Sequence, residues 1–355
     1  MRFDTSGLDL DDLATQVRSS HGLPISSLAF VPKGEDAFCY IAATAAGEQY
    51  FVRAKPAERG AEAEETYEAV AALRDRLGIS AVMAPLRSAQ GRFCCEYRGH
   101  VVTVYRFVAG TTVYESGPTS AHVTKAARIM AILHRSDYSF LPPLPLERFD
   151  NPFEPAIREA LTAVTAMPPR SGYEQRIADL LVREQSDVLQ TFVHMRRMQR
   201  AIVQLRSQPV VTHGDANWAN FLVGPEGTLL MTDWGELALG PRERDLMFFT
   251  GEHFAEFLPA YLAQSGPIRL HRLLFAFYLY RWAVQEIADY TTRILRPETT
   301  PDEAEYAWAE LQPYLPVPHA DIRNGLAAVM QTLHRQPSTC GLQVDDRDLD
   351  MEGRI

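Results

Sequence analysis

The sequence predicts an α+β fold of two lobes, a small antiparallel sheet with one helix followed by a larger, mainly helical lobe. The chain has 355 residues and is 46% hydrophobic, which is more than one ordinary domain and enough to bury a large core. Residues 25–108 show strand-like patterns around one helical stretch. After Gly110 the pattern becomes mainly helical. These observations together favour two lobes of different composition.

The first lobe is expected to consist of short strands joined by glycine-containing turns. The strand-like segments are SSLAFVP, AFCYIAAT, GEQYFVRAK, FCCEY and HVVTVYRFV. The segment EAEETYEAVAALRDRLG, which lies between the third and fourth strands, has the periodicity of a helix. We therefore predict that residues 1–108 form a sheet lobe with one inserted helix.

The second lobe is predicted to span residues 109–336. Its helical segments are TSAHVTKAARIMAILHRSD, residues 173–205, HFAEFLPAYLAQ, LHRLLFAFYLYRWAVQEIADYTTRIL and DIRNGLAAVMQTLHRQ. The aromatic run LLFAFYLYRW is expected mainly in the core, with an acceptor pocket as the alternative. Residues 337–355 are polar and acidic with little periodicity, and they predict a flexible tail.

Cysteine usage and hydropathy predict a cytoplasmic protein with no membrane partner. The four cysteines, Cys39, Cys94, Cys95 and Cys340, show no CxxC motif and no metal-ligand spacing, as is typical of a reducing compartment. The N-terminal MRFDTSGLDLDD is acidic where a signal peptide is basic, and no apolar run approaches about 18 residues.

The net charge of −10 argues against a nucleic-acid partner, which normally needs a basic patch. The same charge is compatible with a cationic small-molecule partner. The sequence leaves open whether the protein is a monomer or a homodimer.

Polar side chains gather around a short hairpin in PVVTHGDANWANFLVGPEGTLLMTDWG. PVVTH, NFLV and TLLMT are predicted strands, and a four-residue turn that pairs Val223 with Thr228 would bring Asn220 and Asp233 to one open end. Asp215 lies in the loop that leads into the hairpin. Oxygen ligands of this kind suit a hard cation, most commonly Mg²⁺ with bound phosphate.

The spacing of these residues is that of a kinase catalytic loop. Protein kinases carry His-x-Asp-x-x-x-x-Asn followed by a second Asp before a Gly, in which the first Asp orients the attacking hydroxyl and the Asn and second Asp hold magnesium. His213, Asp215, Asn220, Asp233 and Gly235 follow this order. The complete set of five residues in this order is much less likely to occur by chance than the first three residues alone.

The motifs HGDANWANFLV and MTDWGELALGPRERDL resemble the aminoglycoside phosphotransferase family, a branch of the protein-kinase-like fold. The order of a sheet lobe with one helix, a linker and a helical lobe agrees with that family over nearly the whole chain. YFVRAK, GISAVMAPLRSAQGR and TVYRFVAG look closest to the spectinomycin (aminocyclitol) phosphotransferases.

The resemblance implies a role for each residue of the catalytic loop. Asp215 would be the catalytic base or hydroxyl-orienting carboxylate, and Asn220 and Asp233 would be the magnesium ligands. The nucleotide, ATP or GTP, would bind between the lobes as co-substrate. His213 is expected to pack and hydrogen-bond within the loop rather than to transfer a proton.

The small lobe is expected to hold phosphate through a cation on its third strand, paired with a carboxylate on the following helix. YFVRAK places Arg53 where the family usually has Lys, and Lys55 follows on the same strand face. Arginine can also hold phosphate, so either residue could be the ligand. Glu65 is the preferred helical partner, and Glu62 and Glu64 are rivals.

Two further segments complete the expected nucleotide site. Gly34 in PKGEDAFCY would allow the phosphate-covering loop to approach closely. The linker VYRFVAG, which contains Tyr105 and Phe107, occupies the place where backbone groups would bind the adenine ring.

These inferences predict an O-phosphotransferase that acts on a small, cationic aminoglycoside or aminocyclitol antibiotic such as spectinomycin and so confers resistance. The alternatives are a kinase of another antibiotic or of a metabolite such as choline or homoserine, and a catalytically weak nucleotide-binding pseudokinase, for which the Arg53 substitution is the best support. A metal-dependent hydrolase that uses His213, Asp215 and Asp233 is a further alternative, but it leaves YFVRAK unexplained.

Overall fold

The computed structural model describes residues 6–34, 36–57, 64–166, 172–205, 207–297, 299–335 and 342–344. The chain packs as two compact units, Met1–Pro145 with His213–Leu239, and Leu146–Thr212 with Gly240–Ile355. These packing units differ in extent from the predicted lobes 1–108 and 109–336, whose boundaries stay a prediction. Each unit is described separately below.

The first unit contains a five-stranded antiparallel sheet with the strand order β1-β2-β3-β5-β4. Its strands are β1 (Ile25–Val31), β2 (Phe38–Thr44), β3 (Gln49–Pro56), β4 (Cys94–Tyr97) and β5 (His100–Arg106). Side chains alternate between the two faces of a strand, and in β3 the buried residues Tyr50, Val52 and Ala54 alternate with Phe51, Arg53 and Lys55. Arg53 and Lys55 therefore share the face opposite the core, as predicted.

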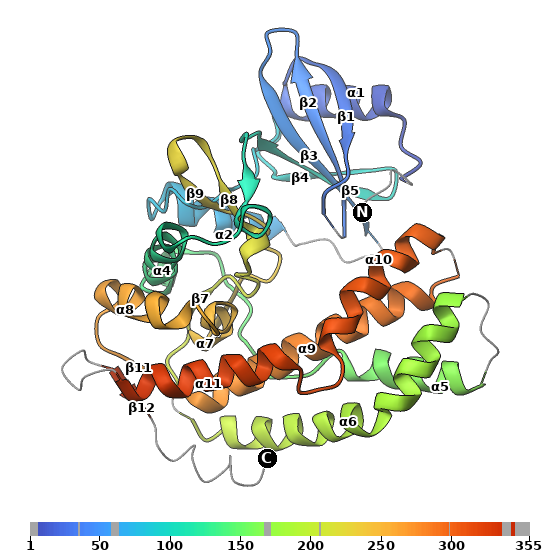
Figure 1. Cartoon of the computed structure of the whole chain (residues 1–355). Coiled ribbons are helices and arrows are strands. Elements are labelled where there is room, and N and C mark those ends of the chain that lie inside the picture. The colour runs from blue at the N-terminus through green and yellow to red at the C-terminus, as the bar shows by residue number, and fades with distance from the viewer. Residues whose placement is uncertain are drawn as a thin grey trace. The chain divides into compact units, whose positions relative to one another are not determined.

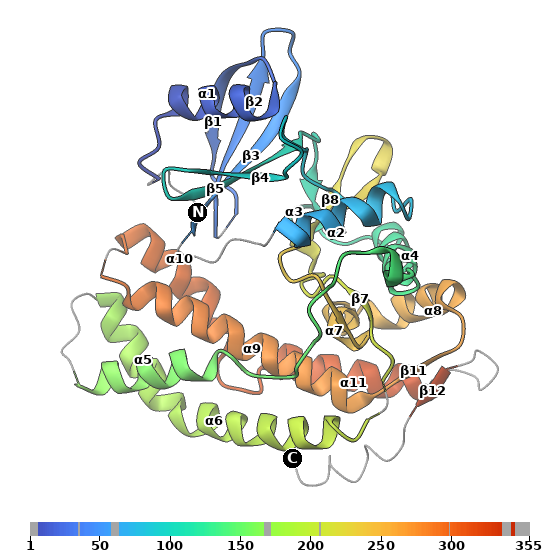
Figure 2. The same cartoon turned by 180° about the vertical axis from the view of Figure 1, so that it is seen from behind.

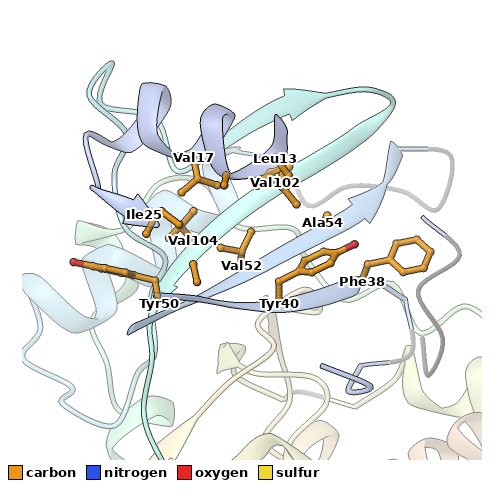
Figure 3. Packing of buried hydrophobic residues seen from close by; sticks show 12 residues of the cluster. Leu13, Val17, Ile25, Phe38, Tyr40, Tyr50, Val52, Ala54, Val102 and Val104 are labelled. Atoms are coloured by element: carbon orange, nitrogen blue, oxygen red, sulfur yellow. The ribbon is translucent and has the colours of Figure 1, made fainter. Parts of the chain in front are cut away.

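Helix α1 (Leu10–His21) covers the core face of this sheet. Leu13 and Val17 are fully buried and pack in one cluster with Val52, Val102 and Val104 (Figure 3). Each buried aliphatic side chain of this size contributes about 1.5–3 kcal/mol to folding. The sequence analysis did not predict α1.

The ends of α1 have clear local causes. The Asp9 side chain accepts hydrogen bonds from the Asp11 and Asp12 amides, which have no partner inside the helix. Gly22 ends the helix in a left-handed conformation with φ of 65°. The acidic residues Asp9, Asp11 and Asp12 therefore form a capped helix start.

In its described residues the first unit also contains three more α-helices and a second, three-stranded sheet with the order β6-β8-β9. The helices are α2 (Glu64–Asp75), α3 (Val113–Ser116) and α4 (Ser120–His134), and the strands are β6 (Thr111–Thr112), β8 (Phe221–Val223) and β9 (Leu229–Met231). Gly110 precedes β6 at a close approach, since a Cβ atom there would lie 2.1 Å from the Val223 carbonyl oxygen. The linker can therefore pair with the hairpin only because residue 110 is glycine.

The second unit is mainly helical. Its helices are α5 (Glu154–Ala166), α6 (Gly172–Ile202), α7 (Glu243–Leu246), α8 (Phe254–Ser265), α9 (Arg272–Leu295), α10 (Pro301–Leu311) and α11 (Ala320–Arg335). Helix α9 packs against α5, α6, α10 and α11 (Figures 1 and 2). The predicted aromatic core is confirmed, because Phe275, Phe277, Tyr278 and Tyr280 of α9 are all buried.

Four further strands are short. They are β7 (Val210–Thr212), β10 (Ala238–Gly240), β11 (Ile268–Leu270) and β12 (Leu342–Val344). Strand β12 pairs in parallel with β11 and was not predicted. The rest of the predicted tail, 337–341 and 345–355, lies outside the described residues. The predicted α+β class, with a sheet region followed by a mainly helical region, is confirmed.

A buried ion cluster lies in the second unit. The carboxylate of Glu147 is 3.0 Å from both Arg244 and Arg281 and accepts a hydrogen bond from the Phe149 amide. Arg244 also donates to the Thr212 hydroxyl at 2.9 Å. Burial opposes ionisation of Glu147, but the two guanidinium groups outweigh it and lower the pKa of this carboxyl.

No helix in the described parts of the chain combines the length and the hydropathy that crossing a bilayer requires.

Candidate active site

The β8–β9 hairpin presents the candidate site at its open end. Val223 pairs with Leu229, one residue later than the predicted Thr228. The reason is the turn, in which the Gly224 amide donates to the Thr228 carbonyl and Gly227 adopts a φ of 69°. Because the Thr232 amide donates to the Asn220 carbonyl at 3.0 Å, the corrected register still leaves Asn220 beside Asp233.

Asp215 is held by two neighbouring amides. Asn217 donates to one carboxylate oxygen at 2.6 Å, and Asn220 donates to the other at 2.8 Å. The same Asn220 nitrogen also donates to the Asp215 carbonyl at 2.8 Å, which turns its amide oxygen the other way. The loop therefore fixes both the carboxylate of Asp215 and the orientation of Asn220.

The electrostatic surroundings of Asp215 make it unlike an ordinary aspartate. Burial raises its pKa to about 7, and the negative charges of Asp233 and Glu236 act in the same direction. The hydrogen bonds from Asn217 and Asn220 oppose this rise but do not cancel it. A carboxyl group with such a pKa can change protonation near neutral pH, and a positive charge placed beside Asp233 would lower that pKa.

His213 supports the loop from beneath. It is fully buried, its Nε2 donates to the Thr232 carbonyl at 2.9 Å, and its Nδ1 accepts from the Asp215 amide at 3.2 Å. These partners require a neutral ring with the proton on Nε2. The ring also contacts Trp234, with centroids 4.5 Å apart. This is the packing role predicted for His213.

Asp233 has a left-handed backbone conformation with φ of 58°. Such a conformation costs a non-glycine residue on the order of 1–3 kcal/mol, and aspartate is among the side chains that tolerate it best. The following Trp234 is buried and donates from its indole nitrogen to the Met231 carbonyl at 3.1 Å. This anchor holds the turn after β9, in which Asp233 lies.

The strand cations meet two carboxylates. Arg53 donates to both oxygens of Asp36 at 2.8 and 3.0 Å and lies 3.6 Å from Asp233, while Lys55 lies 2.8 Å from Asp36. Burial would raise the pKa of Asp36, but the charges of Arg53 and Lys55 outweigh it and hold that pKa well below its usual range. Arg53 thus links the first sheet to the hairpin.

Sequence reasoning missed Asp36, although it lies in the predicted loop PKGEDAFCY. A signal was available in the strand register. Phe38 pairs with Ala54, so continuing the same register puts Asp36 next to the end of β3 that carries Lys55.

The predicted helical carboxylates are placed differently. Glu64 accepts from the Phe93 amide at 2.6 Å and contacts Cys94, so its carboxylate is directed to β4. Glu65 is exposed, and among the described residues it forms no ion pair with Arg53 or Lys55. The structure therefore does not bring Glu65 to these cations. Glu62 lies outside the described residues.

Residues of the loop between β1 and β2 contact β2 and α3. Gly34 has φ of 85°, and a Cβ atom there would lie 3.2 Å from the sulfur of Cys39. Lys33 forms an ion pair with Glu115 of α3 at 3.0 Å.

Burial raises the pKa of Cys39 to about 11, so this thiol stays protonated and is a poor nucleophile.

The linker residues lie at the end of the first sheet. Tyr105 pairs with Phe51 of β3, and the Phe107 amide donates to the Gln49 carbonyl at 3.2 Å. Tyr105 and Phe107 are partly buried. All the candidate residues described above, from Gly34 to Asp233, belong to the first unit.

Comparison with known proteins identifies the family. The profile of the phosphotransferase enzyme family matches residues 27–275, which is more than half of the chain. Protein StrN of Streptomyces griseus is 27% identical over 264 residues, which are 70% of this chain and 76% of that protein.

Solved structures show the same fold. The crystal structure of spectinomycin phosphotransferase APH(9)-Ia with ADP and spectinomycin has a TM-score of 0.72 at 16% identity and covers 91% of this chain and 99% of its own. The amicoumacin kinase hAmiN with AMP-PNP, Ca²⁺ and Ami has a TM-score of 0.56 at 14% identity, with 92% and 95% covered. The kinase-like fold and the family suggested by the HGDANWANFLV motif are thereby confirmed. The chain belongs to the phosphotransferase enzyme family.

Proposed function

We propose that the protein transfers the γ-phosphoryl group of ATP or GTP to a hydroxyl group of a small molecule, with Mg²⁺ as the metal cofactor. The observation that carries this proposal is the convergence of Asp215, Asn220, Asp233 and Arg53 at the end of one hairpin. In this proposal residues 1–108 form the nucleotide-binding lobe and 109–336 the catalytic and acceptor-binding lobe.

Asp215 is the proposed catalytic residue. Its carboxylate accepts a hydrogen bond from the acceptor hydroxyl and aligns that oxygen with the γ-phosphorus. The hydrogen bonds from Asn217 and Asn220 support this role because they fix the carboxylate before the acceptor arrives.

Asn220 and Asp233 are the proposed metal ligands, and their chemistry fits a hard cation. The Asn220 nitrogen donates to Asp215, which leaves its amide oxygen as the donor atom for a metal, and Asp233 supplies a carboxylate beside it. Mg²⁺ prefers such oxygen ligands and would supply positive charge to the phosphate oxygens. Burial is the main cause of the raised pKa of Asp215, and the negative charges of Asp233 and Glu236 raise it further, so a bound cation would relieve the repulsion among these carboxylates.

Arg53, Lys55 and the β1–β2 loop are proposed to hold the phosphates. The two cations share one face of β3, and Gly34 lets the loop backbone approach closely. Backbone groups of the linker around Tyr105 and Phe107 are proposed to bind the base.

The proposed acceptor is a cationic aminocyclitol or aminoglycoside of the spectinomycin type. The support is the fold shared with spectinomycin phosphotransferase and the net charge of −10, which favours a cationic substrate. If this acceptor is correct, the enzyme confers resistance to the antibiotic.

Other acceptors share part of this support. The amicoumacin kinase has the same fold, and so does a choline/ethanolamine kinase family protein from Mesorhizobium loti with a TM-score of 0.51. A different antibiotic or a hydroxylated metabolite is therefore the second candidate. Family membership leaves no separate support for the hydrolase alternative.

A nucleotide-turnover screen tests the proposal. The wild-type protein and Asp215→Ala are incubated with Mg-ATP or Mg-GTP and panels of aminocyclitols, aminoglycosides, macrolides and small alcohols. We expect ADP or GDP release that depends on an aminocyclitol and is absent from the variant. Nucleotide binding without transfer to any acceptor would favour a catalytically weak binding protein instead.

The cellular location and assembly remain part of the proposal. A cytoplasmic location is supported by Cys39, Cys94 and Cys95, which are free thiols. A monomer and a homodimer both fit, and size-exclusion chromatography with light scattering distinguishes them.

A further inference from the structure

Asp36 contacts both strand cations at once. Its carboxylate accepts two hydrogen bonds from Arg53, at 2.8 and 3.0 Å, and lies 2.8 Å from the Lys55 ammonium group. It reaches them from the β1–β2 loop, which is the segment proposed to cover the phosphates. No role was assigned to Asp36 by the sequence motifs.

The chemistry of this contact matches that of a phosphate. A guanidinium group recognises carboxylate and phosphate through the same two-oxygen geometry, and an ammonium group binds either as a point charge. Asp36 therefore places two acceptor oxygens and one negative charge against the cations to which the proposed function assigns the nucleotide phosphates.

The contact is both well formed and open to exchange. Arg53 and Lys55 are each only 12% exposed, so their charges are largely withdrawn from water, whereas Asp36 is 42% exposed. An exposed carboxylate on a loop can turn into solvent, where water replaces its partners. Buried strand cations cannot do the same and need a negative partner at all times.

We infer that Asp36 is a built-in competitor of the nucleotide, a carboxylate that occupies the phosphate-binding cations and is displaced when a nucleoside di- or triphosphate binds. This inference rests on the proposed function and concerns the same site. Asp36 would thereby weaken the binding of any ligand whose phosphates must take its place, and it would leave the binding of a ligand without phosphate unchanged.

The size of the effect follows from population arithmetic. The apparent affinity of a ligand is its intrinsic affinity multiplied by the fraction of molecules whose site is accessible. If the Asp36 contact is formed about nine-tenths of the time, its removal tightens phosphate binding about ten-fold. Adenosine has no phosphate and does not compete with Asp36, so its affinity should stay within about two-fold.

The experiment compares Mg-ADP and adenosine binding by calorimetry in wild type, Asp36→Asn and Asp75→Asn. Asp75 pairs with Arg74 at an exposed position. Asp75→Asn removes the same charge as Asp36→Asn away from the strand cations, so it is the matched control. We expect the ADP dissociation constant to fall about ten-fold in Asp36→Asn and to be unchanged in Asp75→Asn. Asp36→Ser, measured alongside, provides a second variant should Asp36→Asn unfold.

Each alternative outcome has a distinct meaning. Weaker or unchanged ADP binding in both Asp36 variants overturns the inference, and weaker binding would identify Asp36 as a group that positions Arg53 and Lys55. Equal tightening of ADP and adenosine also overturns it, because competition requires phosphate. If the wild type binds neither ligand, the proposed function fails together with the inference.

Discussion

Two charge clusters, one in each unit, both place a carboxylate between two cations, but the two carboxylates differ in their exposure to solvent. Glu147 bridges Arg244 and Arg281 in the second unit, and Asp36 bridges Arg53 and Lys55 in the first. The Glu147 side chain is 5% exposed, whereas that of Asp36 is 42% exposed.

The difference in exposure predicts a difference in role. In the described part of the chain Glu147 pairs with two guanidinium groups and one backbone amide. The loss of one partner from such a buried pair leaves a charge that water cannot reach. Asp36 can exchange its partners with solvent or with a ligand. A carboxylate between two cations therefore stabilises the fold where it is buried, and it can act as a functional group where it is exposed beside a hairpin that carries further acidic side chains.

The largest expected effect is a loss of turnover with nucleotide binding retained, from a substitution in the first unit. Asp215→Ala removes the carboxylate that would orient the hydroxyl, so we expect kcat to fall by about 10²- to 10⁴-fold. Mg-ADP binding should change little, because Asp215 is not assigned to the nucleotide. Steady-state kinetics and calorimetry measure the two quantities. Near-normal turnover in this variant would remove Asp215 from the catalytic role.

The matching test in the second unit is Glu147→Gln. It leaves two guanidinium groups without their carboxylate, and breaking a buried pair in this way costs about 3–5 kcal/mol of unfolding free energy. Urea unfolding followed by circular dichroism measures the loss. Asp75→Asn, which breaks an exposed pair, should cost at most about 1 kcal/mol. Equal losses in the two variants would contradict the distinction between buried and exposed clusters.

Substitution of each strand cation in turn tests which of the two binds the nucleotide phosphates. A charge-assisted hydrogen bond is worth about 1.5–3 kcal/mol, so loss of the main phosphate ligand should raise the nucleotide KM by roughly ten- to a hundred-fold. Arg53→Met and Lys55→Met, compared at saturating acceptor, show which residue has this role. We expect the larger effect for Arg53, since it also reaches Asp233. No effect from either substitution would place the phosphates elsewhere.

The smallest effect concerns acid stability. The folded pKa of Glu147 lies below its ordinary value of 4.5, so its contribution is fully present above pH 4.5 and is lost as the pH falls through the folded pKa. We expect the unfolding free energy of wild type to decrease more steeply below pH 4.5 than that of Glu147→Gln. Parallel curves, measured by urea titration at each pH, would show that Glu147 does not titrate with unfolding.

The candidate catalytic loop could be predicted from sequence because its information is local. The fixed spacing from His213 to Gly235 and the strand patterns around it place the acidic and amide side chains on one hairpin. The register was wrong by one residue because it depends on the left-handed conformation of Gly227, which a pattern of apolar residues does not reveal.

Other features depend on tertiary contacts and were missed. Asp36 contacts Arg53 and Lys55 only because β2 pairs with β3, and the loop sequence alone does not show which cation it contacts. The preference for Glu65 relied on sequence distance, and Glu65 is exposed in the fold. Helix α1, which was not predicted, does carry local signals, an N-cap at Asp9 and a terminating glycine at Gly22.

The central claim is that Asp215 and Asp233 act as parts of one phosphoryl-transfer site. The most direct measurement is a double-mutant cycle on acceptor-dependent kcat with Asp215→Asn, Asp233→Asn and the double variant. Residues that act as a unit give strongly non-additive losses, so the double variant should lose about as much activity as the worse single variant. Losses that multiply, or a single variant that retains wild-type turnover, would contradict a shared site.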